Sequence, residues 1–573
     1  MIIDAAAAVA APTASASSQC GGDPSPPHAT APLPTQTTTN NEAPLPSPPP
    51  PSKEVRWRDL PNKDQLFILA LCRLSEPLSN VCLLPYIFYL VRSVLPPAAN
   101  ENGTVSDPHA EAARVSTYSG ILVAAFPLAQ FFVSLPWGWL SDRHGRRVSI
   151  LAGLAVSVLA NVGFGLSRSL GALLFWRVLA GLGNGNVGIM RTVTAEIVRE
   201  RRFQTKAFLL LPLVFNSGMV LSLALGGWLA EPVANLPWLF GPGGVFNVGG
   251  NPEGVKWTLA YPYALPALIN ATTLAFTLVL AVLGLRETLA GKESAEDCGL
   301  RIGRSLSTWF QAYVYPRRGK GYATIGSQDS ELLIERGDRA EKASTPDAGP
   351  IQKAVPRPFS QIWTREVLAS LISFGLLPLH NSAFMHIFPV YLSSPPADNT
   401  EASIFAFTGG LGLRSASIGI WLSTFGVGGI LLQLFIYPRL QARIGTRGVF
   451  RIALFLFPAT YAAAPYLSLV AGDSVVRYLL LGVVVCAQIM ARTMAIPSTV
   501  ILLTESAPDK SVLGTIHGAG NMLASLARAV GPALGGWVFA LGVEEGIIGL
   551  VWWLYLVIIA ALALVWSLFI DMG

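Results

Sequence analysis

A short charged stretch between two long apolar runs places the strongest constraint on how this chain can fold. The stretch reads GWLSDRHGRRV at residues 138–148, and it separates the apolar residues 118–137 from the apolar residues 148–166. Each run is about as long as the roughly 20 residues that a helix needs to cross a bilayer. The charged turn therefore lies at a membrane face. Its arginines place that face in the cytosol, because short basic loops stay on the cytosolic side.

We make specific predictions for four residues of this turn. We expect Gly138 and Gly145 to permit the close approach and the positive φ angles of a tight turn. Asp142 is the exceptional residue, an acid among cations. It can pair with Arg146, and it can also face the positive N-terminal end of a neighbouring helix.

The apolar pattern repeats along the chain and predicts twelve membrane spans. Only 13% of the residues are charged, about half the share found in soluble domains, which is about 25%. The net charge of +6 follows from Lys and Arg gathered in predicted cytosolic segments, so it does not indicate a nucleic-acid partner. The predicted spans are approximately 65–94, 118–137, 148–166, 170–197, 208–230, 259–285, 366–392, 418–437, 449–470, 475–504, 516–541 and 547–570.

Changes in composition predict four regions. Residues 1–60 form a Pro/Ser/Thr-rich cytosolic tail that cannot bury a core and is expected to be disordered. Residues 61–288 hold six spans, residues 289–362 form a polar cytosolic linker, and residues 363–573 hold six more spans. The five cysteines have no paired spacing, so we expect no metal site and no cofactor.

Internal repeats support two halves of equal construction. The charged turn recurs as PRLQARIGTR at residues 438–447, where Ala442 stands opposite Asp142. The string Gly226-Gly227-Trp228 recurs as Gly535-Gly536-Trp537. Repeated halves around a central site are a known construction of secondary transporters.

The turn at 138–148 resembles the loop signature G-x-L-x-D-R-x-G-R-R of the major facilitator superfamily. Residues 177–183 likewise resemble the family's R-x-x-x-G-x-G signature. The span-one string Arg-Leu-x-Glu-Pro at 73–77 resembles the drug:proton antiporter branch, in particular its fungal and plant subgroup that includes the zinc-induced facilitators. One departure is that Ser222-Leu223 stands where the antiporters carry Gly-Pro. The resemblance implies an all-α membrane protein with twelve transmembrane helices in two six-helix halves, in which spans one, four, seven and ten line a central cavity.

Charged residues inside the predicted spans are the candidates for function. An ionised side chain at the bilayer centre costs at least about 2.5 to 3.5 kcal/mol, so it must face a partner or a cavity. The proton-coupling candidates are Glu76, Arg73, Arg177 and His380, with Glu76 as the proton carrier. The alternative for Glu76 is a static pair with Arg73 that holds span one against span four. His380 could equally be a hydrogen-bonded histidine of the cavity.

Two further groups of residues complete the predicted site. The substrate cavity is expected to include Arg191, Asn381, Gln488 and Arg492, and Arg528 is a further charge within a span. The gating residues are Asp142, Arg146, Gly138 and Gly145. The resemblance implies that Asp142 meets the N-terminal end of span eleven, near residues 514–518, when the cytosolic side is closed. A permanent ion pair within the turn is the alternative.

These residues predict a secondary transporter rather than an enzyme, since no nucleophile and base are set together among the spans. We expect proton-coupled export of a small organic molecule, such as a drug, a secondary metabolite or a metal chelator, by alternating access. The alternatives are a uniporter or uptake carrier, and a non-transporting membrane sensor on the same scaffold. The expected partners are a small-molecule substrate, protons and the lipid bilayer. We expect a monomer in the plasma membrane or the vacuolar membrane.

Overall fold

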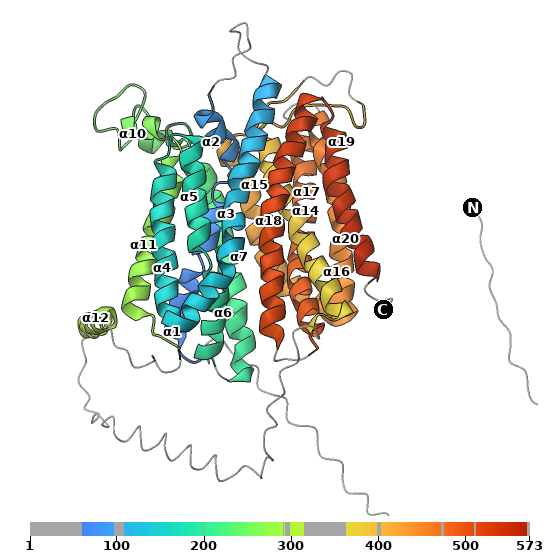
Figure 1. The fold of residues 1–573 in the computed structure, drawn as a ribbon. Helices are drawn as coiled ribbons and strands as arrows, with labels where there is room; N and C mark the ends of the chain where they lie inside the picture. The colour runs from blue at the N-terminus through green and yellow to red at the C-terminus, as the bar shows by residue number, and fades with distance from the viewer. Residues whose placement is uncertain are drawn as a thin grey trace, which may run out of the picture. The chain divides into compact units, whose positions relative to one another are not determined.

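The computed structural model describes a predominantly helical chain (Figure 1). The described residues are 60–96, 108–198, 200–289, 292, 298–314, 362–397, 403–470, 475–508 and 512–569. Apart from Leu60, the predicted N-terminal tail lies outside them, as does most of the predicted linker. The prediction that these segments are disordered and cytosolic therefore stays a prediction.

The helices before residue 315, blue to yellow-green in Figure 1, include two predicted spans that are broken. The first predicted span consists of α1, the short π-helix η2 and α2, and the fourth consists of α5 and α6. Pro77 starts η2 and has no N–H to donate to the carbonyl of Arg73, which explains the first break. The bounds are α1 Lys63–Cys72, η2 Pro77–Val81, α2 Ile87–Val94, α3 Pro108–His144, α4 Arg146–Gly165, α5 Leu170–Gly183, α6 Asn186–Ile197, α7 Arg201–Leu229, α8 Pro232–Asn235, α9 Pro237–Phe240, α10 Lys256–Ala260, α11 Ala264–Gly284 and α12 Cys298–Val314.

The helices after residue 362, yellow to red in Figure 1, are longer and more continuous. Helices α15, η4, α16 and η5 follow one another without a loop. The bounds are α14 Arg365–Ser393, α15 Ser415–Leu431, η4 Leu432–Ile436, α16 Tyr437–Ala463, η5 Ala464–Leu469, α17 Val475–Glu505, α18 Leu513–Glu544, α19 Ile548–Trp552, η7 Trp553–Val557 and α20 Ile558–Phe569.

Among the described residues, eight helices are long and apolar enough to cross a membrane. The difference from the twelve predicted spans has local causes. The spans predicted at 65–94 and 170–197 are broken into shorter helices, and among the described residues of α7 the apolar helix Leu213–Leu229 is shorter than a full span. One continuous helical run, Ser415–Leu469, carries two predicted spans. The helical fold class is confirmed, and the count of twelve spans in two halves stays a prediction.

Glycines of the internal repeat join the N-terminal helices to the C-terminal helices. A Cβ atom at Gly536 on α18 would lie 2.6 Å from the carbonyl oxygen of Ser116 on α3. A Cβ atom at Gly227 on α7 would lie 2.5 Å from the carbonyl oxygen of Ser415 on α15. Only small residues let helix backbones approach this closely in lipid. The two copies of the repeated Gly-Gly-Trp string thus make equivalent contacts.

These contacts lie far from the charged turn. We call the end of the helix bundle at which α3 meets α4, near Asp142 and Arg146, the basic end. Gly120 on α3, where a Cβ atom would meet Pro532 of α18, is 22 residues from Asp142, or about 33 Å along a helix. The N-terminal and C-terminal helices are therefore in close backbone contact toward the end opposite the basic end.

Candidate functional site

The break in the first span positions the central charged residues. Arg73 follows α1 directly and Glu76 directly precedes η2, so both lie where the helix changes its winding. Nη1 of Arg73 donates to Oε2 of Glu76 at 2.5 Å. The three-residue spacing of Arg73 and Glu76 thus brings the two side chains together.

A second arginine reaches Glu76 from the far end of the sequence. Nη1 of Arg528, on α18, lies 3.5 Å from Oε1 of Glu76, so each carboxylate oxygen faces a guanidinium group. Arg528 also donates to Ser525 at 3.1 Å, and Arg73 lies over the ring of Phe215 on α7, 4.9 Å from its centroid. The cluster of Arg73, Glu76 and Arg528 therefore connects helices from before and after the linker.

Two more arginines are placed nearby: Arg191 lies close to this cluster, and Arg492 contacts α7. Arg191 on α6 is exposed to solvent and interacts electrostatically with Arg73, Glu76 and Arg528. Arg492 on α17 donates from both Nη atoms to the sulfur of Met219, at 3.3 and 3.4 Å. A thioether is a weak acceptor. Within the described part of the chain, neither Arg191 nor Arg492 has a carboxylate at ion-pair distance.

Arg177 lies apart from Glu76. It donates to the carbonyl oxygen of Ser79 at 2.7 Å, to Oδ1 of Asn80 at 2.8 Å and to the carbonyl oxygen of Leu122 at 3.2 Å. These acceptors belong to η2 and to α3, so Arg177 ties the broken part of the first span to α3. Its predicted role in proton coupling is not tested by these contacts.

His380, Asn381 and Gln488 form a second polar group among the C-terminal helices. Nδ1 of His380 lies 2.9 Å from the hydroxyl of Tyr461. Gln488 donates to Oδ1 of Asn381 at 3.1 Å. The buried Nε2 of His380 and Oε1 of Gln488 have no hydrogen-bond partner among the described residues. Gln488 and Arg492 are four residues apart and so share a face of α17.

Exposure separates Glu76, Arg177 and His380 from the apolar surface. Glu76, Arg177 and His380 are 3%, 2% and 0% exposed. Large apolar side chains such as Phe132 on α3 and Phe455 on α16 are each 66% exposed. A lipid environment requires this arrangement, in which apolar residues face outward and ionisable residues lie inside.

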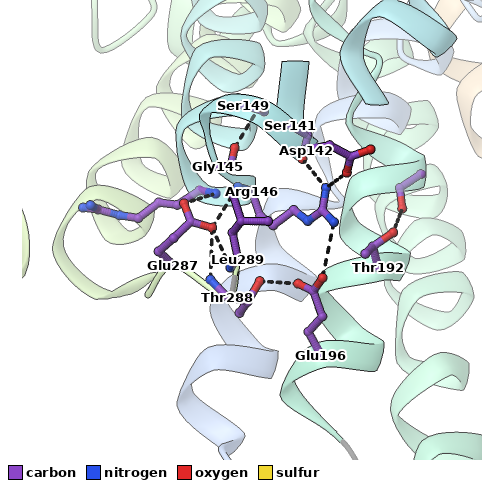
Figure 2. Close-up of polar contacts among 12 residues, drawn as sticks. Ser141, Asp142, Gly145, Arg146, Ser149, Thr192, Glu196, Glu287, Thr288 and Leu289 are labelled. Atoms are coloured by element: carbon purple, nitrogen blue, oxygen red, sulfur yellow. Dashed lines mark hydrogen bonds and ion pairs between the residues drawn. The ribbon is translucent and has the colours of Figure 1, made fainter. Parts of the chain in front are cut away.

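Figure 2 shows how the charged turn is held at the basic end. Arg146 pairs with Asp142, as the sequence predicted, and its Nη2 lies 3.4 Å from Oε1 of Glu196 on α6. Glu287, just after α11, accepts hydrogen bonds from the backbone N–H groups of Arg146 at 2.8 Å and Arg147 at 3.1 Å. A carboxylate at this place satisfies N–H groups at the start of α4 and faces the positive end of its dipole.

The two glycines of the turn behave differently. Gly145 has a φ of 120°, so its predicted positive φ is confirmed. The prediction for Gly138 was wrong, because α3 continues through Gly138 to His144 and a Cβ atom there would meet nothing within 4 Å. The turn is thus a single residue, shorter than its charge pattern indicates.

Three contacting residues were not foreseen from the sequence. Arg528 was recognised as a charge within a span, but no partner was assigned to it. Met219 has no sequence signal beyond its place in an apolar run. Glu287 could have been predicted as a contact. It is an acid that directly follows the sixth predicted span, and it lies at the same predicted membrane face as the start of the third span.

Comparison with known proteins agrees with this geometry. The family model described as Major Facilitator Superfamily matches residues 80–413. The chain is 30% identical over 529 residues to the major facilitator superfamily multidrug transporter mfsB of Aspergillus fumigatus, covering 87% of this chain and 81% of that protein. It is 25% identical over 470 residues to Protein ZINC INDUCED FACILITATOR 1 of Arabidopsis thaliana, covering 81% of each. The crystal structure of the human organic anion transporter MFSD10 is similar in fold, with a TM-score of 0.52 at 16% identity, over 89% of this chain and 100% of that one.

These observations define the class of the protein: it is a multi-pass membrane protein with buried charges between its helices. The chain belongs to the major facilitator superfamily. The resemblance to its drug-transporting branch and to the fungal and plant subgroup is confirmed. The protein is therefore a membrane transporter of small molecules.

Proposed function

We propose that this protein exports a small organic molecule in exchange for protons, with twelve spans in two six-helix halves that alternate in access to a central site. In this proposal the basic end faces the cytosol, and the protein works as a monomer in the plasma membrane or the vacuolar membrane. The domain boundaries are those expected from the sequence, 61–288 and 363–573 for the two halves. No cofactor is required.

The observation that carries the proposal is the position of Glu76 between Arg73 and Arg528. The carboxylate is buried and it links a helix before the linker to a helix after it. Protonation of Glu76 removes its charge and therefore weakens both ion pairs. Loss of one partner from a buried ion pair is costly, because the other charge is left uncompensated. A proton on Glu76 thus favours a rearrangement of α18 relative to α1, which is the step that alternating access needs.

The excess of positive charge supports an acidic substrate. Arg73, Arg191, Arg492 and Arg528 provide four guanidinium groups, and Glu76 provides one carboxylate among them. Both oxygens of that carboxylate already face arginines, so it is poorly placed to receive a cation. A substrate with a carboxylate, sulfonate or phosphate would pair with Arg492 or Arg191. Of the classes expected from the sequence, carboxylate-bearing metabolites and metal chelators fit this charge pattern better than cationic drugs.

The test is proton movement in proteoliposomes that contain a trapped pH-sensitive dye. Two size-matched probes are added under an imposed pH gradient, benzenesulfonate as the anion and phenyltrimethylammonium as the cation. We expect benzenesulfonate to cause proton movement in the wild type. Glu76→Gln should abolish that movement. Arg92→Gln should not, because Arg92 lies on the surface in a pair with Glu111.

Each other outcome selects another function. Probe flux that ignores the pH gradient would indicate a uniporter, and absence of flux for every probe would indicate a non-transporting sensor. Proton movement with phenyltrimethylammonium alone would keep the exchange mechanism and contradict the acidic substrate. Proton movement that survives in Glu76→Gln would remove Glu76 as the carrier.

A further inference from the structure

Helix α12 has an exposed apolar face that the transport mechanism does not use. Ile302, Leu306 and Trp309 are 54%, 49% and 63% exposed. Their spacing of four and three residues places them on one side of the helix. Exposed large apolar residues that are grouped on one face indicate an interaction surface rather than chance exposure.

The face of α12 beside these apolar residues is polar and basic. Arg301, Arg304, Ser305 and Thr308 are exposed and recur at the same spacing of three and four residues. A helix with an arginine-bearing face next to an apolar face that includes Trp is typical of segments that lie in a membrane interface.

The backbone of α12 is held at the end of a membrane-spanning helix. A Cβ atom at Gly303 would lie 1.9 Å from the carbonyl oxygen of Leu283, so the two backbones touch at this point. Leu283 is in the last turn of α11, which ends at Gly284, and Glu287 follows at the basic end. In Figure 1, α12 is seen nearly end-on while α11 runs up the page, so α12 crosses α11. This places α12 along the membrane face at the level where α11 leaves the bilayer.

We propose that α12 lies in the bilayer interface at the basic end and binds anionic phospholipids. Ile302, Leu306 and Trp309 enter the boundary of the acyl chains, and Arg301 and Arg304 pair with the headgroups. The position of the helix favours lipid over a protein partner, because a helix lying across the end of a span presents its side to the plane of the leaflet. The first part of the linker is then a membrane-surface segment rather than a free cytosolic one.

The test uses the full chain in lipid nanodiscs with a nitroxide carried by an unnatural amino acid, so that the native cysteines stay. One variant carries the label at Leu306 and a matched variant carries it at the next residue, Ser305. Nanodiscs are made of phosphatidylcholine with and without phosphatidylserine. Collision rates with oxygen, which concentrates in lipid, and with a water-soluble nickel chelate report the surroundings of each label.

We expect the nickel collision rate at 306 to be severalfold lower than at 305, and the oxygen collision rate to be higher. Phosphatidylserine should deepen this difference, and Arg301→Gln with Arg304→Gln should abolish the deepening. Equal nickel collision rates at 306 and 305 would overturn the proposal, because the apolar face would then be in water. A label at 306 shielded from both reagents would also overturn it, since a protein surface would then cover the face. A difference that phosphatidylserine leaves unchanged would overturn the pairing of the arginines with anionic headgroups.

Discussion

The charged turn at residues 138–148 and its repeat at 438–447 share a backbone feature but differ in the contacts around it. Both contain a glycine with positive φ, 120° at Gly145 and 71° at Gly445. Around Gly145, carboxylates from Asp142, Glu196 and Glu287 converge on Arg146 and on the start of α4. Around Gly445 a Cβ atom would meet nothing within 4 Å, and Gln441 donates to Thr446 at 3.0 Å. The repeat has preserved the turn, and in the first copy a charge network ties α3, α4, α6 and α11 together.

We expect the largest effect on stability from substitution of the two turn glycines, Gly145 and Gly445. Gly145→Ala should lower the free energy of unfolding by about 3 kcal/mol, because a side chain at this φ is strained by about 1 to 3 kcal/mol. A Cβ atom at Gly145 would also lie 2.4 Å from Oε2 of Glu287 and displace the carboxylate that caps α4. Gly445→Ala should cost only this strain, and therefore less than Gly145→Ala, because a Cβ atom at Gly445 would meet nothing within 4 Å. Chemical unfolding of the detergent-solubilised protein measures both values.

Gly138→Ala is the matched control for this pair. Gly138 lies inside α3 with open space around it, and alanine favours a helix over glycine by about 1 kcal/mol. This variant should be as stable as the wild type or more so. Equal losses for Gly145→Ala and Gly445→Ala would contradict the difference between the two turns.

Substitution of Asp142, the acid of the turn, should have a much smaller effect on stability. The side chain of Asp142 is 68% exposed, and exposed ion pairs contribute about 0 to 1 kcal/mol. Asp142→Asn should therefore lower the free energy of unfolding by less than about 0.5 kcal/mol, close to the value for a helical pair four residues apart. Building the same pair into the repeat, with Ala442→Asp and Thr446→Arg, should raise it by a similarly small amount.

Asp142→Asn also separates the two roles predicted for this residue. A gating role requires the transport rate to fall while stability stays nearly constant. A loss of stability as large as that of Gly145→Ala would instead mark Asp142 as a structural part of the turn.

Local pairs could be predicted from the sequence, whereas contacts between distant segments could not. The pairs Arg73–Glu76 and Asp142–Arg146 follow from a spacing of three or four residues on a helix, and both are present. The positive φ of Gly145 follows from its place between two apolar runs. The contact of Arg528 with Glu76 depends on how α18 lies against the first span, and no periodicity encodes that.

Helix continuity was the other source of error. Hydropathy treats residues 65–94 and 170–197 as uninterrupted, but Pro77 and the glycines at 183–185 break them. Conversely, the charges at 142–144 suggested a loop that the backbone does not make, since α3 runs through them. A polar side chain can extend past a membrane face while its backbone stays helical, so charge marks the membrane face better than it marks the end of a helix.

The most direct test of the account is a distance across the basic end at two pH values. Nitroxide labels at Gly138 on α3 and Gly518 on α18 have open space around them, and pulsed dipolar spectroscopy measures the distance between them. If protonation of Glu76 releases Arg528, the distance distribution of the wild type shifts on acidification, and Glu76→Gln shows the acidic distribution already at alkaline pH. A Glu76→Gln protein that matches the alkaline wild type and still responds to pH would contradict the account.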